Sequence, residues 1–188
     1  MAADPGSRPT YVLVDGENID ATLGTSILGR RPRPEERPRW ERLLQFARER
    51  WDQPARGLFF LAANTELPMT FVQALLAIGY RPVPLSGGPG EKVVDIAIQR
   101  TLVELGRREA DVMLVSNDGD FVEQVGDILD GRRVGVIGFV EFRNSAFVPL
   151  AERGLETFDL EYDVQAFNER LPRVRIIPID EFDPAQFL

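Results

Sequence analysis

The sequence contains no cysteine and no histidine among its 188 residues. Without cysteine the chain can form neither disulfides nor thiolate metal sites, and without histidine it has no imidazole base, no serine–histidine pair and no histidine-bound zinc. Lysine occurs once, as Lys92. Any catalysis by this protein must therefore depend on carboxylates, hydroxyls, amides, arginines or Lys92.

Long hydrophobic runs are also missing. No uninterrupted apolar stretch approaches the roughly 18 residues that a membrane-spanning helix needs. The beginning of the chain, MAADPGSRPTYVLV, lacks the basic and apolar regions of a signal peptide. We therefore expect a soluble, cytoplasmic protein without a membrane partner. With 44% hydrophobic residues, the chain can fold around one sizeable core.

The chain is acidic, with a net charge of −8, which argues against broad binding of nucleic acids. Residues 30–50 differ, because they hold eight arginines against four glutamates. One interpretation is a basic arm that contacts phosphates through Arg30, Arg31 and Arg33. The other is a solvated, proline-rich loop before an exposed helix face. The sequence leaves both open.

Short apolar runs alternate with helical patterns along the chain. Strands are predicted at 10–14, 56–63, 80–85, 111–116 and 132–139, and helices at 38–51, 67–79, 91–105 and 121–130. The third strand contains two prolines and is expected at an edge of the sheet. Strands that alternate with crossover helices predict an α/β fold, in which a mostly parallel sheet is covered on both faces. The expected strand order is 3-2-1-4-5.

Acidic residues follow two strands of this predicted sheet. The first strand ends in VDGEN and the fourth in VSNDGD. In the expected order these strands are neighbours about 4.8 Å apart, at the point where the strand order reverses, so that Asp15 and Asp118 can reach one ion. Asp95 stands among apolar residues in the helix after the third strand. An acid in that position requires a reason.

Each acid also has an ordinary explanation. The two Asp-Gly pairs are typical of turns, and Asp120 with Glu123 forms a helix-capping box. Asp95 could favour the positive end of its helix dipole or pair with Lys92 one turn earlier. Three unrelated turns or caps, however, have no reason to fall at converging ends of one sheet. The combination favours a metal site.

The motifs VDGEN, KVVD and VSNDGDF, the last followed by GRRVGVIGF, resemble the NYN-domain family of PIN-like nucleases, in its bacterial LabA-like branch. The similarity covers about residues 10–160, with an arginine- and proline-rich insert at about 29–39. Residues 161–188 would be an extension of unknown role. The resemblance implies a PIN-like three-layer sandwich and a ribonuclease that depends on Mg²⁺ or Mn²⁺. It places Asp15, Asn18, Asp95, Asp118 and Asp120 in the family's acidic cluster, Ser116 at its strand-end hydroxyl and Lys92 at its basic position.

The inventory of side chains is consistent with that chemistry. Without histidine, cleavage needs a water whose pKa is lowered by a hard ion with oxygen ligands. We expect Asp15 and Asp118 as central ligands, with Asp95 and Asp120 completing the shell. Asn18, Lys92, Ser116 and the arginines of the insert are the expected contacts to single-stranded RNA, which would be hydrolysed to leave a 5′ phosphate.

Two other functions fit the same residues. One is a non-catalytic module that binds RNA or a protein and whose acidic cluster holds a structural ion. The other is a Mg²⁺-dependent phosphatase that forms a phospho-aspartate, because DGE, Lys92 and NDGD could supply the nucleophile, acid, charge partner and metal ligands. The RNA target, endo or exo action, the number of metals and a homo-oligomeric state are left open.

Overall fold

Six parallel strands form one sheet in the computed structural model, which describes residues 8–64 and 66–188. The strands are β1 (Thr10–Asp15), β2 (Ala55–Ala62), β3 (Tyr80–Leu85), β4 (Asp111–Val115), β5 (Val134–Gly138) and β6 (Glu156–Asp159). All neighbouring pairs are parallel, and their order is β3-β2-β1-β4-β5-β6. The predicted order 3-2-1-4-5 is confirmed, and the proline-containing β3 lies at an edge.

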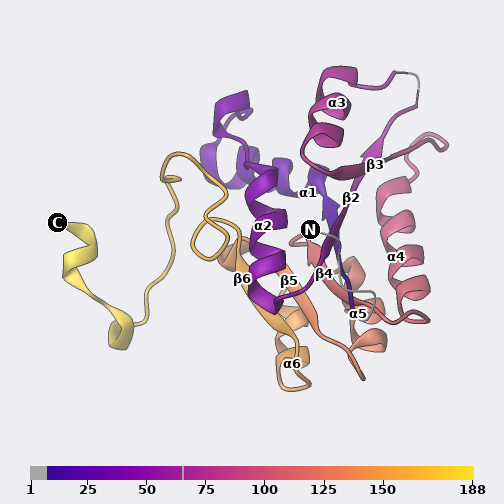
Figure 1. Ribbon diagram of the computed structural model, residues 1–188. Helices are drawn as coiled ribbons and strands as arrows, with labels where there is room; N and C mark the ends of the chain where they lie inside the picture. The colour runs from indigo at the N-terminus through magenta and orange to yellow at the C-terminus, as the bar shows by residue number, and fades with distance from the viewer. Residues whose placement is uncertain (1–7, 65) are drawn as a thin grey trace.

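Helices cover both faces of this sheet (Figure 1). They are α1 (Gly16–Ala21), α2 (Trp40–Trp51), α3 (Met69–Ala77), α4 (Val93–Leu105), α5 (Val122–Ile128) and α6 (Val148–Ala151). Alternate residues of β1 point to opposite faces. Val12 and Val14 pack in a core with α1 and α2, whereas Leu13 packs in a second core with α4 and α5. The α/β fold with three layers is thereby confirmed.

The segment after β1 is helical, although its Asp-Gly pair suggested only a turn. Asp15 is the N-cap of α1, where its side chain accepts a hydrogen bond from the Asn18 N–H. A π-helical segment, Thr22–Leu28, continues the helix. Gly16 is needed because a Cβ there would lie 2.5 Å from the ring of Phe59. The carboxylate that ends β1 thus also begins a helix.

Side chains of the arginine-rich insert form ion pairs within the insert and with α1. The Arg30 guanidinium pairs with both carboxylate oxygens of Glu36 at 2.6 and 2.7 Å. The Arg37 Nε donates to Asp20 at 2.7 Å. The backbone N–H of Arg39 donates to the Ala166 carbonyl, which ties the insert to the segment after β6. The insert is therefore an ordered part of the surface.

The segment after β6 begins as part of the domain and ends away from it. Val164, Ala166 and Leu171 belong to the core that covers α2. From Val174 onwards most apolar side chains are exposed, Val174 by 91% and Ile176 by 97%, and the chain extends away from the body to its C-terminus (Figure 1). None of the helices in the described part of the chain is long and apolar enough to cross a membrane. Residues 1–7, half of the N-terminal stretch MAADPGSRPTYVLV in which no signal peptide is expected, lie outside the described residues.

Candidate metal centre

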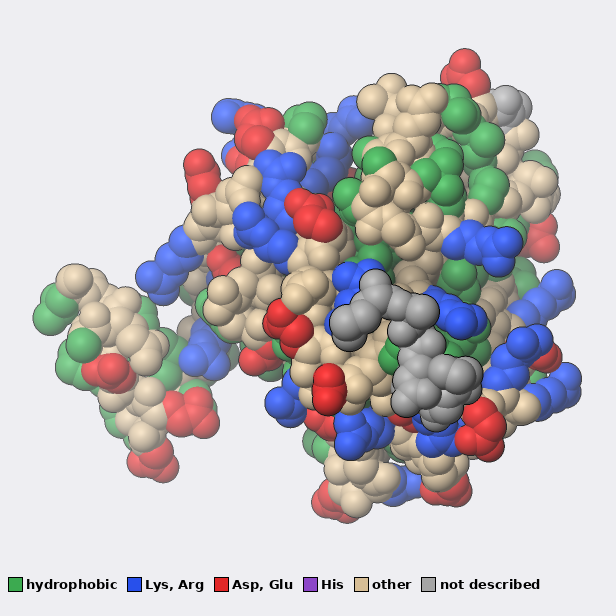
Figure 2. Space-filling view, in the orientation of Figure 1, with side chains coloured by type: hydrophobic (Ala, Val, Ile, Leu, Met, Phe, Trp, Pro, Cys, Tyr) green, Lys and Arg blue, Asp and Glu red, His purple; other side chains and the backbone are tan. Residues whose placement is uncertain are grey.

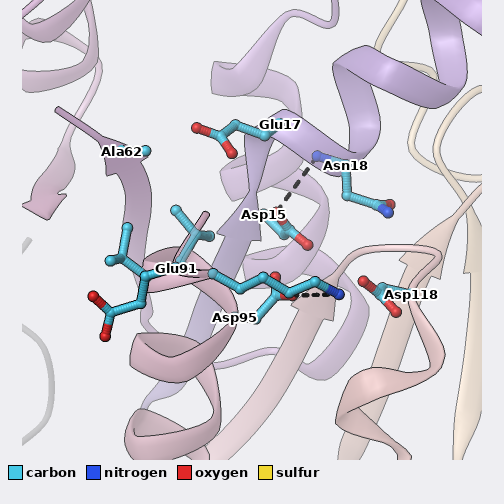
Figure 3. Close-up of a pocket in the computed structure, with 10 residues that line it drawn as sticks. Asp15, Glu17, Asn18, Ala62, Glu91, Asp95 and Asp118 are labelled. Carbon is cyan, nitrogen blue, oxygen red and sulfur yellow. Dashed lines mark hydrogen bonds and ion pairs between the residues drawn. The ribbon is translucent and has the colours of Figure 1, made fainter. Parts of the chain in front are cut away.

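The predicted acids meet at the carboxyl ends of β1 and β4, where the strand order reverses. Asp15, Asp95 and Asp118 all line one open pocket of about 320 Å³. Their carboxylates point towards a common space in Figure 3, with Asp95 coming from the first turn of α4. Carboxylate oxygens of Asp95, Asp118 and Asp120 lie within 4.8 Å of one another.

Asp15 lies beneath that group and is only 2% exposed. One of its carboxylate oxygens accepts from the Asn18 N–H at 3.5 Å, and the other accepts from the Ser116 hydroxyl at 2.9 Å. The Ser116 oxygen in turn accepts from the backbone N–H of Asp118 at 3.1 Å. Ser116 therefore links the two acids and, being fully buried, cannot touch a substrate.

Asp118 shapes the loop that carries the neighbouring acid. Its side chain accepts from the Asp120 N–H at 2.9 Å and caps the 3-10 turn Gly119–Phe121. The capping box expected from Asp120 does not form, because α5 begins after Phe121 without a side-chain cap. A glycine stands between the two acids because a Cβ at Gly119 would lie 2.4 Å from the Asn144 amide. Turn chemistry and an acidic cluster thus coexist in one loop.

Lys92 is the cation nearest to these carboxylates in the part of the chain that the structure describes. Its Nζ lies 3.3 Å from Asp120 and 3.8 Å from Asp95. The pairing with Asp95 anticipated from the sequence is present, but the lysine is exposed, and exposed ion pairs are weak. Its hydrogen bond to Asp120 raises the pKa of Lys92, so the amine stays charged. One exposed amine leaves the cluster with surplus negative charge.

Burial and mutual repulsion both act on the acids. Burial raises the pKa of Asp15 to about 6, with further contributions from Asp95 and Asp118. Burial likewise raises the pKa of Asp95, and the charge of Asp118 adds to it. A cation at the pocket would relieve both effects, since it favours the charged form of each carboxylate. The oxygen-only donor set fits Mg²⁺ or Mn²⁺.

The raised pKa of Asp15 predicts how stability depends on pH. The folded-state pKa of about 6 exceeds the ordinary value of 3.8, so ionisation costs more in the folded state and stability declines as pH rises between these values. In chelator, unfolding in urea should show that Asp15→Asn gains about 2 kcal/mol relative to the parent between pH 4 and pH 7. A difference in unfolding free energy that stays constant with pH would mean that the pKa of Asp15 is not raised in the folded state.

Several pocket residues were not among the predicted ones. Glu17 and Glu91 line the pocket, and Asn117 lies beneath the loop, where its side chain accepts from the Phe139 N–H and donates to Thr22. The Asn117 N–H donates to Oδ1 of Asn18, which orients the Asn18 amide at the pocket. Glu17 lies in the motif VDGEN and Asn117 in VSNDGD. Their closeness in sequence to Asp15 and Asp118 was the only feature that could have predicted their place at the site.

Arg30 and Arg31 lie at a different depression, beside α1 and the π-helical segment. Arg31 and Arg33 are exposed, whereas Arg30 is tied to Glu36. The structure therefore does not bring the predicted arginines into the acidic pocket. They are placed on the neighbouring surface of the same domain.

Comparison with known proteins decides the family. A family model described as the NYN domain matches residues 9–153. The chain belongs to the NYN domain family. This is a family of PIN-like nucleases that generally bind RNA, and the acids of this NYN domain lie within the matched range.

The fold of this NYN domain also occurs in a solved structure. A crystal structure of a protein of unknown function from Vibrio parahaemolyticus is similar, with a TM-score of 0.65 and 17% sequence identity over 86% of this chain and 98% of that one. At that identity the likeness shows the shared fold. No curated protein matches the chain.

Proposed function

We propose that this NYN protein is a ribonuclease that uses Mg²⁺ or Mn²⁺ to hydrolyse phosphodiester bonds of single-stranded RNA. The observation that carries this proposal is the group formed by Asp95, Asp118 and Asp120, whose carboxylate oxygens lie within 4.8 Å of one another. Asp95 and Asp118 line an open pocket, and the domain belongs to a nuclease family. Membership of the LabA-like branch and a cytoplasmic location accompany the proposal as predictions.

The proposed roles follow from burial and contacts. Asp95, Asp118 and Asp120 would hold the cation, which when bound lowers the pKa of a nearby water and offsets charge on the phosphate. Asp15 was predicted as a central ligand. In this proposal the buried Asp15 would instead position Asp118, because Ser116 is hydrogen-bonded to both residues.

The remaining polar residues of the pocket would contact the substrate. Asn18 has its Oδ1 engaged by Asn117, so its amide N–H groups can donate to a phosphate oxygen. Lys92 is exposed and can move from its weak ion pairs to the same phosphate. Both side chains supply donors, which a cluster of carboxylates lacks.

The two alternative functions are less well supported. A purely structural ion would be expected among enclosed ligands, but the Asp120 side chain is 48% exposed, and Asp95 and Asp118 line an open pocket. A phosphatase would need a free nucleophilic oxygen on Asp15, yet both of its carboxylate oxygens accept hydrogen bonds and the residue is buried. A cation-dependent nuclease needs accessible carboxylates close to one another, which Asp95, Asp118 and Asp120 provide.

The test is incubation of the purified protein with 5′-labelled single-stranded RNA in Mn²⁺, in Mg²⁺ and in chelator. Matched samples contain duplex RNA or p-nitrophenyl phosphate. Cleavage of the single strand that requires either ion and leaves 5′ phosphates supports the proposal. Binding without cleavage in both ions would favour the interaction module, and hydrolysis of p-nitrophenyl phosphate alone would favour the phosphatase.

The arginine-rich insert provides a separate prediction about binding. If Arg31 and Arg33 contact phosphates, replacing both with serine should flatten the dependence of log K on log salt by about 0.7 for each lost contact with a single strand. Arg30→Ser should change the slope less, because Glu36 already neutralises Arg30. Replacement of Arg107 and Arg108, which pair with Glu104 beyond the far end of α4, is the control. An unchanged slope would identify the insert as a solvated surface.

A further inference from the structure

A second cavity, which we call the aromatic groove, lies between α1, α2 and α3. It has a volume of about 340 Å³ and is lined chiefly by Trp40, Phe59, Leu61, Pro68 and Phe71, with Glu17 and Arg37 at its polar side. The stretch 67–79, which supplies Pro68 and Phe71, contains no charged residue. Figure 2 shows hydrophobic side chains gathered over α3. One wall of the groove is therefore uncharged and open to solvent.

The rings in the groove are held in a fixed arrangement. Phe59 packs edge-to-face against Trp40 and Phe71, with ring centroids 5.2 and 5.3 Å apart. Phe59 and Trp40 are buried, whereas Phe71 is 36% exposed. Gly16 lets α1 approach the Phe59 ring, since any side chain there would collide with it. Phe71 thus presents an aromatic surface that is backed by two buried rings.

The groove adjoins the acidic pocket. Glu17 lines both cavities. Leu61 lines the groove, and the next residue of β2, Ala62, lines the acidic pocket. A ligand that placed one part at the acids could place an adjoining part in the groove.

We propose that the aromatic groove binds a nucleobase of single-stranded RNA, next to the phosphate that is cleaved. The proposal rests on the proposed ribonuclease function. A nucleotide joins a phosphate to a flat π-face through a sugar, which matches an acidic, cation-fitting pocket beside an aromatic one. Unpaired bases are commonly bound by stacking on aromatic side chains, and such stacking tolerates any base. An apolar peptide would fill the groove but would not account for its continuity with the acids.

The test compares variants of two exposed apolar residues on the same helix. Phe71 lines the groove, whereas Leu76 is 57% exposed and is not among its lining residues. Binding of a labelled single-stranded ten-nucleotide RNA is measured by fluorescence anisotropy in Ca²⁺, with cleavage checked on a gel. Phe71→Ala should weaken binding about tenfold, and Leu76→Ala should leave it unchanged. Phe71→Trp should retain the affinity and Phe71→Leu should not, because stacking needs a π-face.

RNAs with a single abasic position give the second readout. An RNA that lacks the base at one particular position should bind the parent about tenfold more weakly than the intact RNA. Phe71→Ala should not weaken the affinity for that abasic RNA any further. If Phe71→Leu binds like the parent, or if no abasic position removes the effect of Phe71→Ala, the groove does not bind a base. Melting temperatures confirm that each variant is folded.

The outcomes separate this proposal from the ribonuclease proposal. Cleavage in Mn²⁺ with equal affinities for Phe71→Ala and Leu76→Ala would overturn the base site and leave the nuclease intact. Binding that depends on Phe71 and on one base, without cleavage in Mn²⁺ or Mg²⁺, would support the base site and overturn the nuclease. A parent protein that binds no RNA would overturn both.

Discussion

Replacing Asp118 with asparagine should reduce cleavage of single-stranded RNA by more than about a hundredfold, since loss of even an outer partner of a metal ligand costs about 10- to 100-fold. The loop should survive, because the asparagine Oδ1 can accept from the Asp120 N–H as the carboxylate does. The substitution therefore removes a charge and a proposed ligand without removing the cap.

Stability provides an independent measurement of the same variant. In chelator, Asp118→Asn should melt above the parent, because it relieves a repulsion with Asp95 and Asp15 on the order of 1 kcal/mol. In millimolar Mn²⁺ the parent should gain stability by binding the ion in its folded state, and the variant should gain less. Asp127→Asn, the same change at an exposed position of α5, is the control. A variant that melts like the parent in both conditions and still cleaves RNA would reduce Asp118 to a turn residue.

Arg173→Met should lower the free energy of unfolding by about 3–5 kcal/mol, the range for breaking a buried ion pair from one side. The Arg173 side chain is 2% exposed and pairs with Glu141, Asp159 and Glu161, all of which are largely buried. Its guanidinium also lies 4.4 Å from the centroid of the Tyr162 ring. Without it, three carboxylates would remain buried near one another with no cation between them.

The loss should depend on pH in a definite direction. Burial alone would raise the pKa of Asp159, but hydrogen bonds from Arg173 and from backbone N–H groups outweigh burial and lower it. The stabilisation is therefore present above the ordinary pKa of 3.8 and is lost as pH falls through the lowered value. Urea unfolding at pH 7 and at pH 3 should show a smaller difference between parent and variant at pH 3. Arg175→Met, at an exposed position nearby, should cost little, and a similarly small cost for Arg173→Met would mean that the network does not anchor this segment.

Much of the fold could be predicted from local patterns. Five strands and four helices were located by hydrophobic periodicity, and the alternation of strand and helix led to the parallel sheet and its order. β6 was missed, since only one of its four residues, Phe158, is apolar and the strand follows a region of weak pattern. α1 was missed because Asp15-Gly16 has the composition of a turn, and a capped helix begins with the same residue types.

The meeting of the acids was predictable for a physical reason. Parallel strands end at the same edge of a sheet, so neighbours in the strand order bring the residues after them together, and the helix after β3 begins at that edge with Asp95 in its first turn. The division of labour among the acids was not predictable. Asp15 is buried and accepts a hydrogen bond from Ser116, which stands 101 positions later in the sequence, whereas the Asp120 side chain is 48% exposed. No local pattern distinguishes these two acids.

By itself, the sequence determined the chemistry available to this protein and the end of the sheet where it gathers. Because histidine and cysteine are absent, the side chains available for catalysis are carboxylates, hydroxyls, amides, arginines and Lys92. Apolar periodicity is a local property, so each segment's sequence predicts its own strand or helix. Only the tertiary structure decided how the acids differ in burial, that Arg173 closes a network with three carboxylates, and that Trp40, Phe59 and Phe71 form one groove. These contacts join residues from separate elements, and their distances depend on how whole helices pack on the sheet, which no local pattern encodes.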